Sequence, residues 1–598
     1  MTRSDLMQRR SPMRSLPQGS SQVHHLRHVD TRRRIVVLRV ALVVVLALFA
    51  GRLVELQAVR GETLAGAALD QRLRTIDIPA ARGAILDSNG QPLALSVDAR
   101  NVTADQTLVE DPIATGRAIA GVLGADAATV AERLTGDRRF VYIAKGITPQ
   151  TWDKIAELKL AGIFSEPTTR RIYPAGTTAA NLLGFVGGDG AGLGGVEYAF
   201  QSVLAGESGS MTYERGPGGR PIPTAVQQAL PAVPGSSVQL TINSDIQFAA
   251  QRALEQALRR AKADSGTVVV LEPQTGRILA LVALPTFDPA KPGASPAEDR
   301  GNRALSDVFE PGSTSKVMTL AAVVEEGKAS PTSVLTLPPT LERGDKVFRD
   351  VDPHGTIQLT LAGIMARSSN IGTILAAERI GGKQLWKYLR KFGIGSPTGL
   401  NFPGESTGKL RDYSTWTPTS FPTIAFGQGV SVNALQVASV YATIANDGLR
   451  LTPRLVDAII APDGTVSDVP VGKQVRVVSP QTAREVRRML EVVVSDRGTA
   501  PTAQIPGYRV GGKTGTAMYV DPDCGCYNDG VVASFIGMAP ADAPKLVVAV
   551  SIVNPQNGRY GGQLAAPVFR KVMAYALQAQ HVAPTDSKAP LLPIAPAE

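Results

Sequence analysis

The residues best suited to chemistry are Ser313 and Lys316, which lie in the stretch Phe309-Glu310-Pro311-Gly312-Ser313-Thr314-Ser315-Lys316. The Pro-Gly pair predicts the end of a loop, and the apolar run at 317–324 predicts a buried helix behind it. Three residues apart on a helix, the hydroxyl and the amine share one face. An amine that is buried or crowded by another cation loses its proton more easily, so Lys316 can act as general base on Ser313 without a histidine.

Ser-x-x-Lys is a short pattern, and it equally fits an ordinary surface serine and lysine at the start of a helix. The histidine content favours the catalytic interpretation. Of five histidines, only His354 lies in the predicted globular part. A Ser-His-Asp site therefore has one candidate base, and a multi-histidine metal site lacks ligands. We expect neither a metal nor a cofactor.

Two further motifs follow along the chain. Ser368-Ser369-Asn370 lies in a predicted loop, and Lys513-Thr514-Gly515-Thr516 lies on a predicted strand. The second motif does not fit a phosphate-binding loop, which needs G-x-x-x-x-G-K-[ST] between a strand and a helix. The glycine run at 190–195 matches G-x-G-x-x-G, but its flanks do not alternate as strand–helix–strand. We interpret that run as a flexible connection.

The net charge of +10 is concentrated near the N-terminus, because eight arginines precede residue 35. No basic patch interleaved with aromatic residues stands out beyond it, which argues against nucleic-acid binding. The only cysteines are Cys524 and Cys526. They can form a local disulfide in an oxidising compartment or remain two free thiols, and a metal site would need two further ligands.

The polar and basic composition of residues 1–34 predicts a disordered cytoplasmic tail. Residues 35–53 predict a transmembrane anchor close to the short limit for a span. Arg39 lies near the basic end, where its side chain can reach the headgroups. The end of the apolar run lacks a small-x-small cleavage pattern, which favours an anchor over a signal peptide. The basic flank predicts that the N-terminus stays in the cytoplasm and that the rest of the chain lies outside.

Residues 54–234 alternate short strands and helices and predict a mixed α/β module. Residues 235–577 predict an α+β domain: five antiparallel strands contributed by both ends of the segment, with a helical lobe that holds Ser313 inserted between them. We expect Ser244 to cap a long amphipathic helix. We expect a closing helix at 566–577 and a disordered Pro- and Ala-rich tail at 578–598.

Ser-x-x-Lys, Ser-x-Asn and Lys-Thr-Gly in this order are the signature of β-lactamases and penicillin-binding proteins. The flanking segments at 309–312, 427–429 and 560–562 extend the match. Over residues 53–577 the chain resembles the class B penicillin-binding proteins, and within them the division-specific peptidoglycan D,D-transpeptidases of FtsI type. The resemblance implies the penicillin-binding fold, a five-stranded antiparallel sheet beside a helical lobe, on an N-terminal pedestal.

The resemblance also implies a role for each motif residue. Ser313 attacks the D-Ala–D-Ala bond of a peptidoglycan stem peptide, releases D-alanine and forms an acyl-enzyme that a second stem peptide resolves. Lys316 takes and returns the proton of Ser313. Ser368 relays protons to the leaving amine, and Asn370 holds the acyl-side amide. β-Lactams would acylate the same serine.

The third motif is expected to bind the terminal carboxylate through Lys513, Thr514, Gly515 and Thr516. Lys513 is also expected to lower the pKa of Lys316 by like-charge repulsion. The backbone N–H groups of Ser313 and Thr516 would form the oxyanion hole.

Proteins of different function share these motifs. A β-lactamase would need a deacylating carboxylate in a Glu-x-x-Leu-Asn segment, and Glu405 does not fit that pattern. The motifs are also compatible with a β-lactam-binding sensor and with an elongation-type transpeptidase. The partners that the resemblance implies are lipid-linked glycan strands, the cytoplasmic membrane, a glycan polymerase of SEDS type and division proteins.

Overall fold

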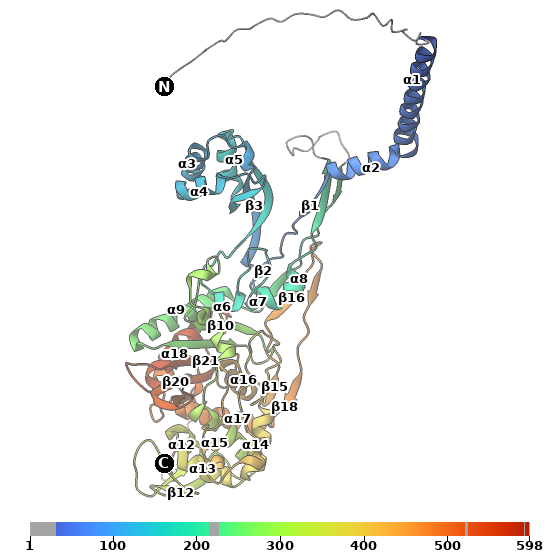
Figure 1. Ribbon diagram of the computed structural model, residues 1–598. Coiled ribbons are helices and arrows are strands. Elements are labelled where there is room, and N and C mark those ends of the chain that lie inside the picture. The colour runs from blue at the N-terminus through green and yellow to red at the C-terminus, as the bar shows by residue number, and fades with distance from the viewer. Residues whose placement is uncertain (1–30, 215–226, 521–523, 591, 597–598) are drawn as a thin grey trace, which may run out of the picture. The chain divides into compact units, whose positions relative to one another are not determined.

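The computed structural model of the protein describes residues 31–214, 227–520, 524–590 and 592–596 (Figure 1). Most of the predicted basic tail, residues 1–30, lies outside the described residues. The chain divides into two compact units. One combines residues 1–76 with 211–229, and the other combines residues 77–210 with 230–598.

The first unit begins with the long apolar helix α1 (Thr31–Val54), which continues into the π-helical turn η1 (Glu55–Val59). Together they are long and apolar enough to cross a membrane, and none of their most apolar window is buried in protein. The predicted anchor at 35–53 lies within this helix. The unit also contains α2 (Gly61–Arg72) and the three-stranded sheet β1 (Leu73–Ile78), β6 (Gly209–Glu214) and β7 (Gln227–Leu230).

The second unit contains the predicted five-stranded sheet, and every neighbouring pair in it is antiparallel. Strands from before and after the helical lobe combine in it, as the sequence predicted. The strand that carries the Lys-Thr-Gly motif is at one edge, so one side of its backbone has no neighbouring strand within this sheet. In spatial order the strands are β10 (Ile278–Leu284), β9 (Ser265–Leu271), β21 (Leu546–Val553), β20 (Tyr527–Ala539) and β19 (Gly511–Val520).

Helices cover this sheet. α9 (Ser244–Ala261) and α18 (Gly561–Ala579) pack against each other and against the sheet, and Phe535 of β20 meets Phe569 of α18 with ring centroids 4.7 Å apart. α16 (Ala434–Ala445) and α17 (Pro480–Val494) form a second such pair. The cap of α9 is Asn243, whose side chain accepts two backbone N–H bonds, so the predicted cap at Ser244 is wrong by one residue.

The helical lobe lies between the two groups of strands in the sequence, and most of its apolar residues belong to the same core as the sheet. The lobe's elements are α11 (Lys316–Glu325), β11 (Val334–Leu337), β12 (Leu341–Arg343), β13 (Lys346–Phe348), β14 (Ile357–Thr360), α12 (Leu361–Arg367), α13 (Asn370–Glu378), α14 (Gly381–Lys391) and α15 (Ser420–Ala425).

A second sheet crosses the boundary predicted at residue 235. β8 (Ser237–Leu240) pairs in parallel with β2 (Ile85–Leu86) and antiparallel with β16 (Val456–Ile460). β3 (Pro92–Ala104), β4 (Val141–Ile147), β5 (Ile163–Ile172) and β17 (Val466–Asp468) complete it. The two predicted domains therefore share a sheet. Between β3 and β5 a smaller core forms around α3 (Pro112–Leu123), α4 (Ala127–Leu134) and α5 (Pro149–Glu157).

The glycine run at 190–195 is packed rather than a flexible connection. A Cβ on Gly195 would lie 2.4 Å from the backbone of Gly184, so the two segments touch. The following helix, α7 (Gly195–Ala199), presents the buried Glu197 to two arginines, Arg82 at 2.6 Å and Arg171 at 2.7 Å. These ion pairs hold the glycine run at 190–195 and α7 against the residues before β2 and against the end of β5.

The C-terminal tail also differs from its prediction. Ile594 is 3% exposed, and its carbonyl accepts the Thr360 N–H at 2.9 Å. The Thr360 hydroxyl donates to the Pro593 carbonyl at 2.6 Å. A Cβ on Gly363 would lie 2.2 Å from the Ile594 carbonyl oxygen. The described part of the tail is therefore ordered and packs on the start of α12. The composition of this Pro-rich segment does not reveal that one apolar side chain, Ile594, is buried there.

Candidate active site

Ser313 lies in the short 3-10 turn Gly312–Ser315, and α11 begins at Lys316. The serine therefore precedes the α-helix rather than opening it. Gly312 has φ +51°, and a Cβ there would lie 3.2 Å from the Ala517 side chain on β19. Glycine thus permits both the left-handed backbone and the close approach of the turn to the Lys-Thr-Gly strand.

Tyr441 of α16 supports this turn from inside the domain. Its side chain is fully buried, and its hydroxyl donates to the Thr314 carbonyl at 2.9 Å. Sequence reasoning missed this residue. The available signal was a tyrosine on a long apolar helix, because a buried phenol usually requires a hydrogen-bond partner.

Lys316 is fully buried, and its amine points to the second motif. Nζ donates to the Ser368 carbonyl, to Ser368 Oγ at 3.3 Å and to Asn370 Oδ1 at 2.8 Å. Burial lowers the pKa of Lys316 to about 7, against the opposing effect of the Asp350 carboxylate. None of the Nζ bonds among the described residues runs to Ser313, and such catalytic contacts often tighten only when substrate is bound.

Ser368 connects the two lysines of the site. It ends α12 in the left-handed conformation with φ +58°. Its Oγ accepts a 2.8 Å bond from Lys513 Nζ as well as the Lys316 contact. Lys513 is also fully buried, and its pKa is lowered first by burial and then by the positive charge of Lys316. Simultaneous protonation of two buried amines this close together is unfavourable, because each positive charge is poorly solvated and repels the other.

The other residues of the third motif follow the strand. Thr514 is 8% exposed, and its hydroxyl is 2.8 Å from the Thr499 hydroxyl. Gly515 packs against the Gly312–Ser315 turn, since a Cβ would lie 2.9 Å from the Thr314 methyl. Thr516 is half-buried and accepts a long 3.4 Å bond from the Gly561 N–H. Thr516 is therefore the more accessible of the two threonine hydroxyls.

Asn370 is the first residue of α13. Its Nδ2 donates to the Arg349 carbonyl at 3.2 Å, so Oδ1 is the atom turned to Lys316. The structure thus places Ser368, Asn370 and Lys513 around Lys316. Asp350, which sequence reasoning missed, contacts the same turn through its carboxylate.

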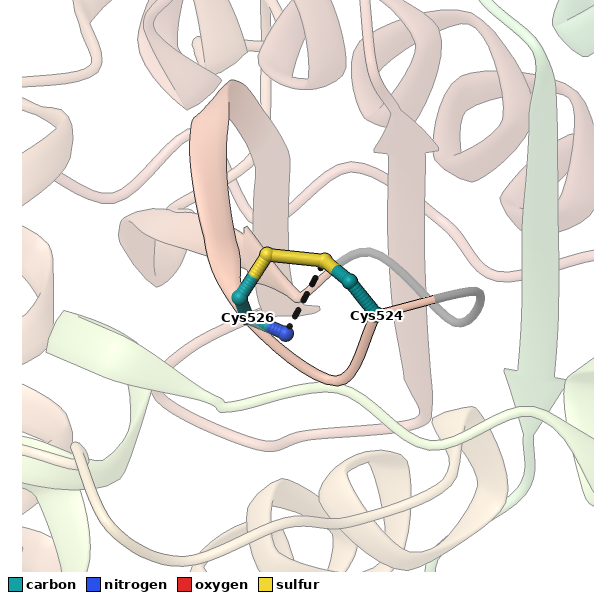
Figure 2. The surroundings of a disulfide bond; sticks show 2 residues. All are labelled: Cys524 and Cys526. Atoms are coloured by element: carbon teal, nitrogen blue, oxygen red, sulfur yellow. Dashed lines mark hydrogen bonds between the residues drawn. A yellow bond between two sulfur atoms is a disulfide. The ribbon is translucent and has the colours of Figure 1, made fainter.

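Glu310 lies in the flank of the Ser-x-x-Lys motif, and its carboxylate connects this flank to two other segments by hydrogen bonds. Its Oε1 accepts the Gly429 N–H at 2.7 Å and the Tyr527 hydroxyl at 2.9 Å. Oε2 is buried and has no hydrogen-bond partner among the described residues. Tyr527 is the first residue of β20, and it directly follows the disulfide between Cys524 and Cys526, which closes a loop of three residues (Figure 2).

Among the described residues no group of three or more histidine, cysteine, aspartate or glutamate side chains is arranged to hold a metal ion.

Comparisons with known proteins place this geometry in a family. Residues 266–574 match the penicillin-binding protein transpeptidase domain, and residues 77–240 match the penicillin-binding protein dimerisation domain. Penicillin-binding protein PbpB of Mycolicibacterium smegmatis is 38% identical over 91% of this chain and 89% of its own length. Peptidoglycan D,D-transpeptidase FtsI of Escherichia coli K12 is 34% identical over 90% of each chain.

Solved structures agree with the sequence matches. The crystal structure of penicillin-binding protein 3 of Mycobacterium tuberculosis in complex with aztreonam aligns with a TM-score of 0.69 and 34% identity, over 87% of this chain and all of that one. The same protein in complex with ampicillin aligns equally well, with a TM-score of 0.69.

Proposed function

Because this chain belongs to the class B penicillin-binding proteins, we propose that Ser313 is the nucleophile of its D,D-transpeptidase reaction and that Lys316 is the general base. The protein is a peptidoglycan D,D-transpeptidase with an N-terminal dimerisation domain. One observation carries the assignment of roles: Ser368 Oγ lies 3.3 Å from Lys316 Nζ and 2.8 Å from Lys513 Nζ, so a proton can pass between the amines through one hydroxyl.

In the first half-reaction, Ser313 Oγ attacks the carbonyl carbon between the two terminal D-alanines, and its proton moves to Lys316 Nζ. Ser368 passes its own proton to the nitrogen of the departing D-alanine as the C–N bond breaks, and Lys316 Nζ returns the Ser313 proton to Ser368 Oγ. In the second half-reaction, the amine of another stem peptide attacks the ester and loses a proton, and Ser313 Oγ is reprotonated as it leaves. Positioned proton transfer of this kind contributes roughly 10²–10⁴-fold.

Burial supports the base role of Lys316. With a pKa of about 7, a substantial fraction of the amine is neutral at physiological pH, whereas an exposed lysine is almost fully charged. Lys513 and Thr516 on the edge strand would bind the terminal carboxylate. Thr514 can also take part, because its hydroxyl can accept from the Thr499 hydroxyl and still donate to a carboxylate. The backbone N–H groups of Ser313 and Thr516 are the proposed oxyanion hole.

We assign α1 to the cytoplasmic membrane as a single-pass anchor, with the N-terminus inside and the catalytic unit outside. The arginines in front of the apolar run support this orientation, and the Cys524–Cys526 disulfide fits an oxidising compartment. Protease added to intact spheroplasts should degrade the catalytic unit. Full protection of that unit would reverse the orientation.

A septal role follows from the relatives named FtsI and PbpB. Depletion should therefore block division and produce filaments, whereas rounding of the cells would indicate an elongation role. By family resemblance, we expect the anchor and pedestal to bind a glycan polymerase of SEDS type and other division proteins. Copurification from cross-linked membranes tests that expectation.

The experiment that tests the catalytic proposal is release of D-alanine from a stem pentapeptide by the purified full-length protein. The wild type should release D-alanine, and Ser313→Ala should release none. Ser315→Ala is a matched control, because its hydroxyl lies in the same turn but is buried without a hydrogen-bond partner among the described residues. Release by Ser313→Ala at the wild-type rate would overturn the proposal.

A further inference from the structure

The C-terminal tail is attached to the catalytic unit at two places, one on the five-stranded sheet and one on the helical lobe. After α18 the chain first contacts the loop in front of β19 and then reaches the start of α12 (Figure 1). β19 carries Lys513, and α12 ends at Ser368. The tail therefore binds the segments that lead into the two elements joined by the Lys513–Ser368 hydrogen bond.

The attachment to the sheet consists of hydrogen bonds to two loops. The Tyr508 hydroxyl donates to the Val582 carbonyl at 2.6 Å, and the Gly507 carbonyl accepts two backbone N–H groups of the tail at 3.1 Å. The Ser587 hydroxyl donates at 2.9 Å to Asp542, which lies between β20 and β21. β19 begins shortly after Tyr508, so this attachment lies at the entrance to the Lys-Thr-Gly strand.

The attachment to the lobe is at the first turn of α12. Thr360 is the cap of this helix, and its hydroxyl oxygen accepts the Gly363 N–H at 2.9 Å. The same hydroxyl donates to the Pro593 carbonyl, and the Thr360 N–H donates to the Ile594 carbonyl. The Ile594 side chain is buried beside them. The residue that sets the first turn of α12 is thus itself bound to the tail.

α12 connects this attachment to the relay hydroxyl. The helix has seven residues, which correspond to about 10 Å of length, and it ends at Ser368. A hydrogen-bonded segment this short moves as one body, so a displacement at Thr360 is passed on to Ser368. α12 also packs against α17. Loss of the tail should therefore shift the helix without unfolding it.

The tail between the two attachments is short. Ser587 and Pro593 are six residues apart in the sequence. Six residues span at most about 22 Å when fully extended. Movement of the lobe away from the sheet beyond that length requires one attachment to break. At the lobe end, a break would expose the buried Ile594 side chain to water.

We propose that the C-terminal tail is a positioning segment of the transpeptidase reaction, a strap between sheet and lobe that holds Ser368 Oγ within reach of Lys513 Nζ. Ile594 is the positioning residue at its lobe end. It acts through α12 and does not touch substrate. The proposal rests on the proposed role of Ser368 as proton relay, because the strap acts on the reaction only through the place of that hydroxyl.

The test measures acylation of Ser313 by a fluorescent penicillin in the wild type, in Ile594→Ala and in a chain truncated after Pro590. The rate constant at saturating penicillin reports the geometry of the folded protein, whereas the labelled fraction reports how much of it is folded. The rate constant should fall about tenfold or more on truncation, and less in Ile594→Ala, because a misplacement of about 1 Å can cost roughly 10²-fold. Truncation after Pro596 keeps both attachments and should leave the rate constant unchanged.

Ile155→Ala is the matched control for lost stability. It removes the same side-chain atoms from the separate core around α3, α4 and α5, where Ile155 is 1% exposed. Its labelled fraction should fall while its rate constant stays at the wild-type value. An equal loss of the rate constant in Ile155→Ala and Ile594→Ala would overturn the proposal.

Truncation in a Ser368→Ala background shows whether the tail acts through that hydroxyl. If it does, removal of the tail should change the rate constant of Ser368→Ala by less than about twofold, because the two changes affect one interaction. An equal loss in both backgrounds would overturn the proposal, as would a wild-type rate constant in the chain truncated after Pro590. Failure of the wild type to label would instead reject the proposed function.

Discussion

Lys513 Nζ donates a 2.8 Å hydrogen bond to Ser368 Oγ across 145 residues of sequence. This bond joins the edge strand of the five-stranded sheet to the end of α12 in the helical lobe, and Lys316 reaches the same hydroxyl from α11. Three elements thus meet at one oxygen atom.

Replacement of Ser368 by alanine should slow acylation by roughly 10²–10⁴-fold, because the proton relay between the two amines is lost. The measurement is the second-order rate constant for a fluorescent penicillin, together with the melting temperature. Ser330→Ala, in an exposed turn, is the control. A Ser368→Ala variant that acylates at the wild-type rate would remove the relay from the mechanism.

The rate of acylation should depend on pH through Lys316. Its burial lowers the pKa to about 7, and the base must be neutral. The rate should therefore rise as pH increases through about 7 and then level off. Because the unfolded lysine has the ordinary high pKa, the unfolded state binds the extra proton between pH 7 and that value, so this group makes stability rise with pH over that window. An acylation rate that is flat from about pH 5.5 to 9 would contradict the assignment of Lys316.

Tyr527→Phe should loosen the contact between β20 and Glu310, which precedes the Gly312–Ser315 turn. The phenol donates to Glu310 at 2.9 Å, and burial raises the pKa of Tyr527 to about 12, so it remains a donor over the working pH range. A bond to a charged group contributes about 1.5–3 kcal/mol. Because the tyrosine is about half exposed, we expect the lower end, measured by urea unfolding. Reduction of the adjacent disulfide should have a smaller effect of the same sign, and no change in Tyr527→Phe would exclude the contact.

The C-terminal tail should contribute to stability. Ile594→Ala should lower the free energy of unfolding by about 2 kcal/mol, the lower end for such a substitution, because a terminal segment can detach. Gly363→Ala should act similarly by filling the slot, since its Cβ would lie 2.2 Å from the Ile594 carbonyl oxygen. Truncation after Pro596 is the control. If truncation after residue 590 leaves the unfolding midpoint unchanged, the tail does not contribute.

The sequence predicted the parts of this site that depend on residue type and spacing. Ser313, Lys316, Ser368 and Lys513 each stand in a recognisable motif, and five antiparallel strands were expected from the two ends of residues 235–577. The motifs also indicated the order of helix, loop and strand.

The sequence did not reveal contacts between segments that carry no motif. Asp350, Tyr441 and Glu310 form hydrogen bonds to residues between 19 and 217 positions away, and nothing local distinguishes them from other polar residues. The tail was misjudged for the same reason. Its composition predicts disorder, whereas one buried isoleucine and two hydrogen bonds from Thr360 hold it to α12.

The most direct test of the account is the location of the penicillin adduct. The full-length protein is incubated with penicillin and digested, and the modified peptide is sequenced by mass spectrometry. The account predicts one penicilloyl group on Ser313, absent in Ser313→Ala and retained in Ser315→Ala. An adduct on Ser315 or Ser368, or an adduct that persists in Ser313→Ala, would contradict it.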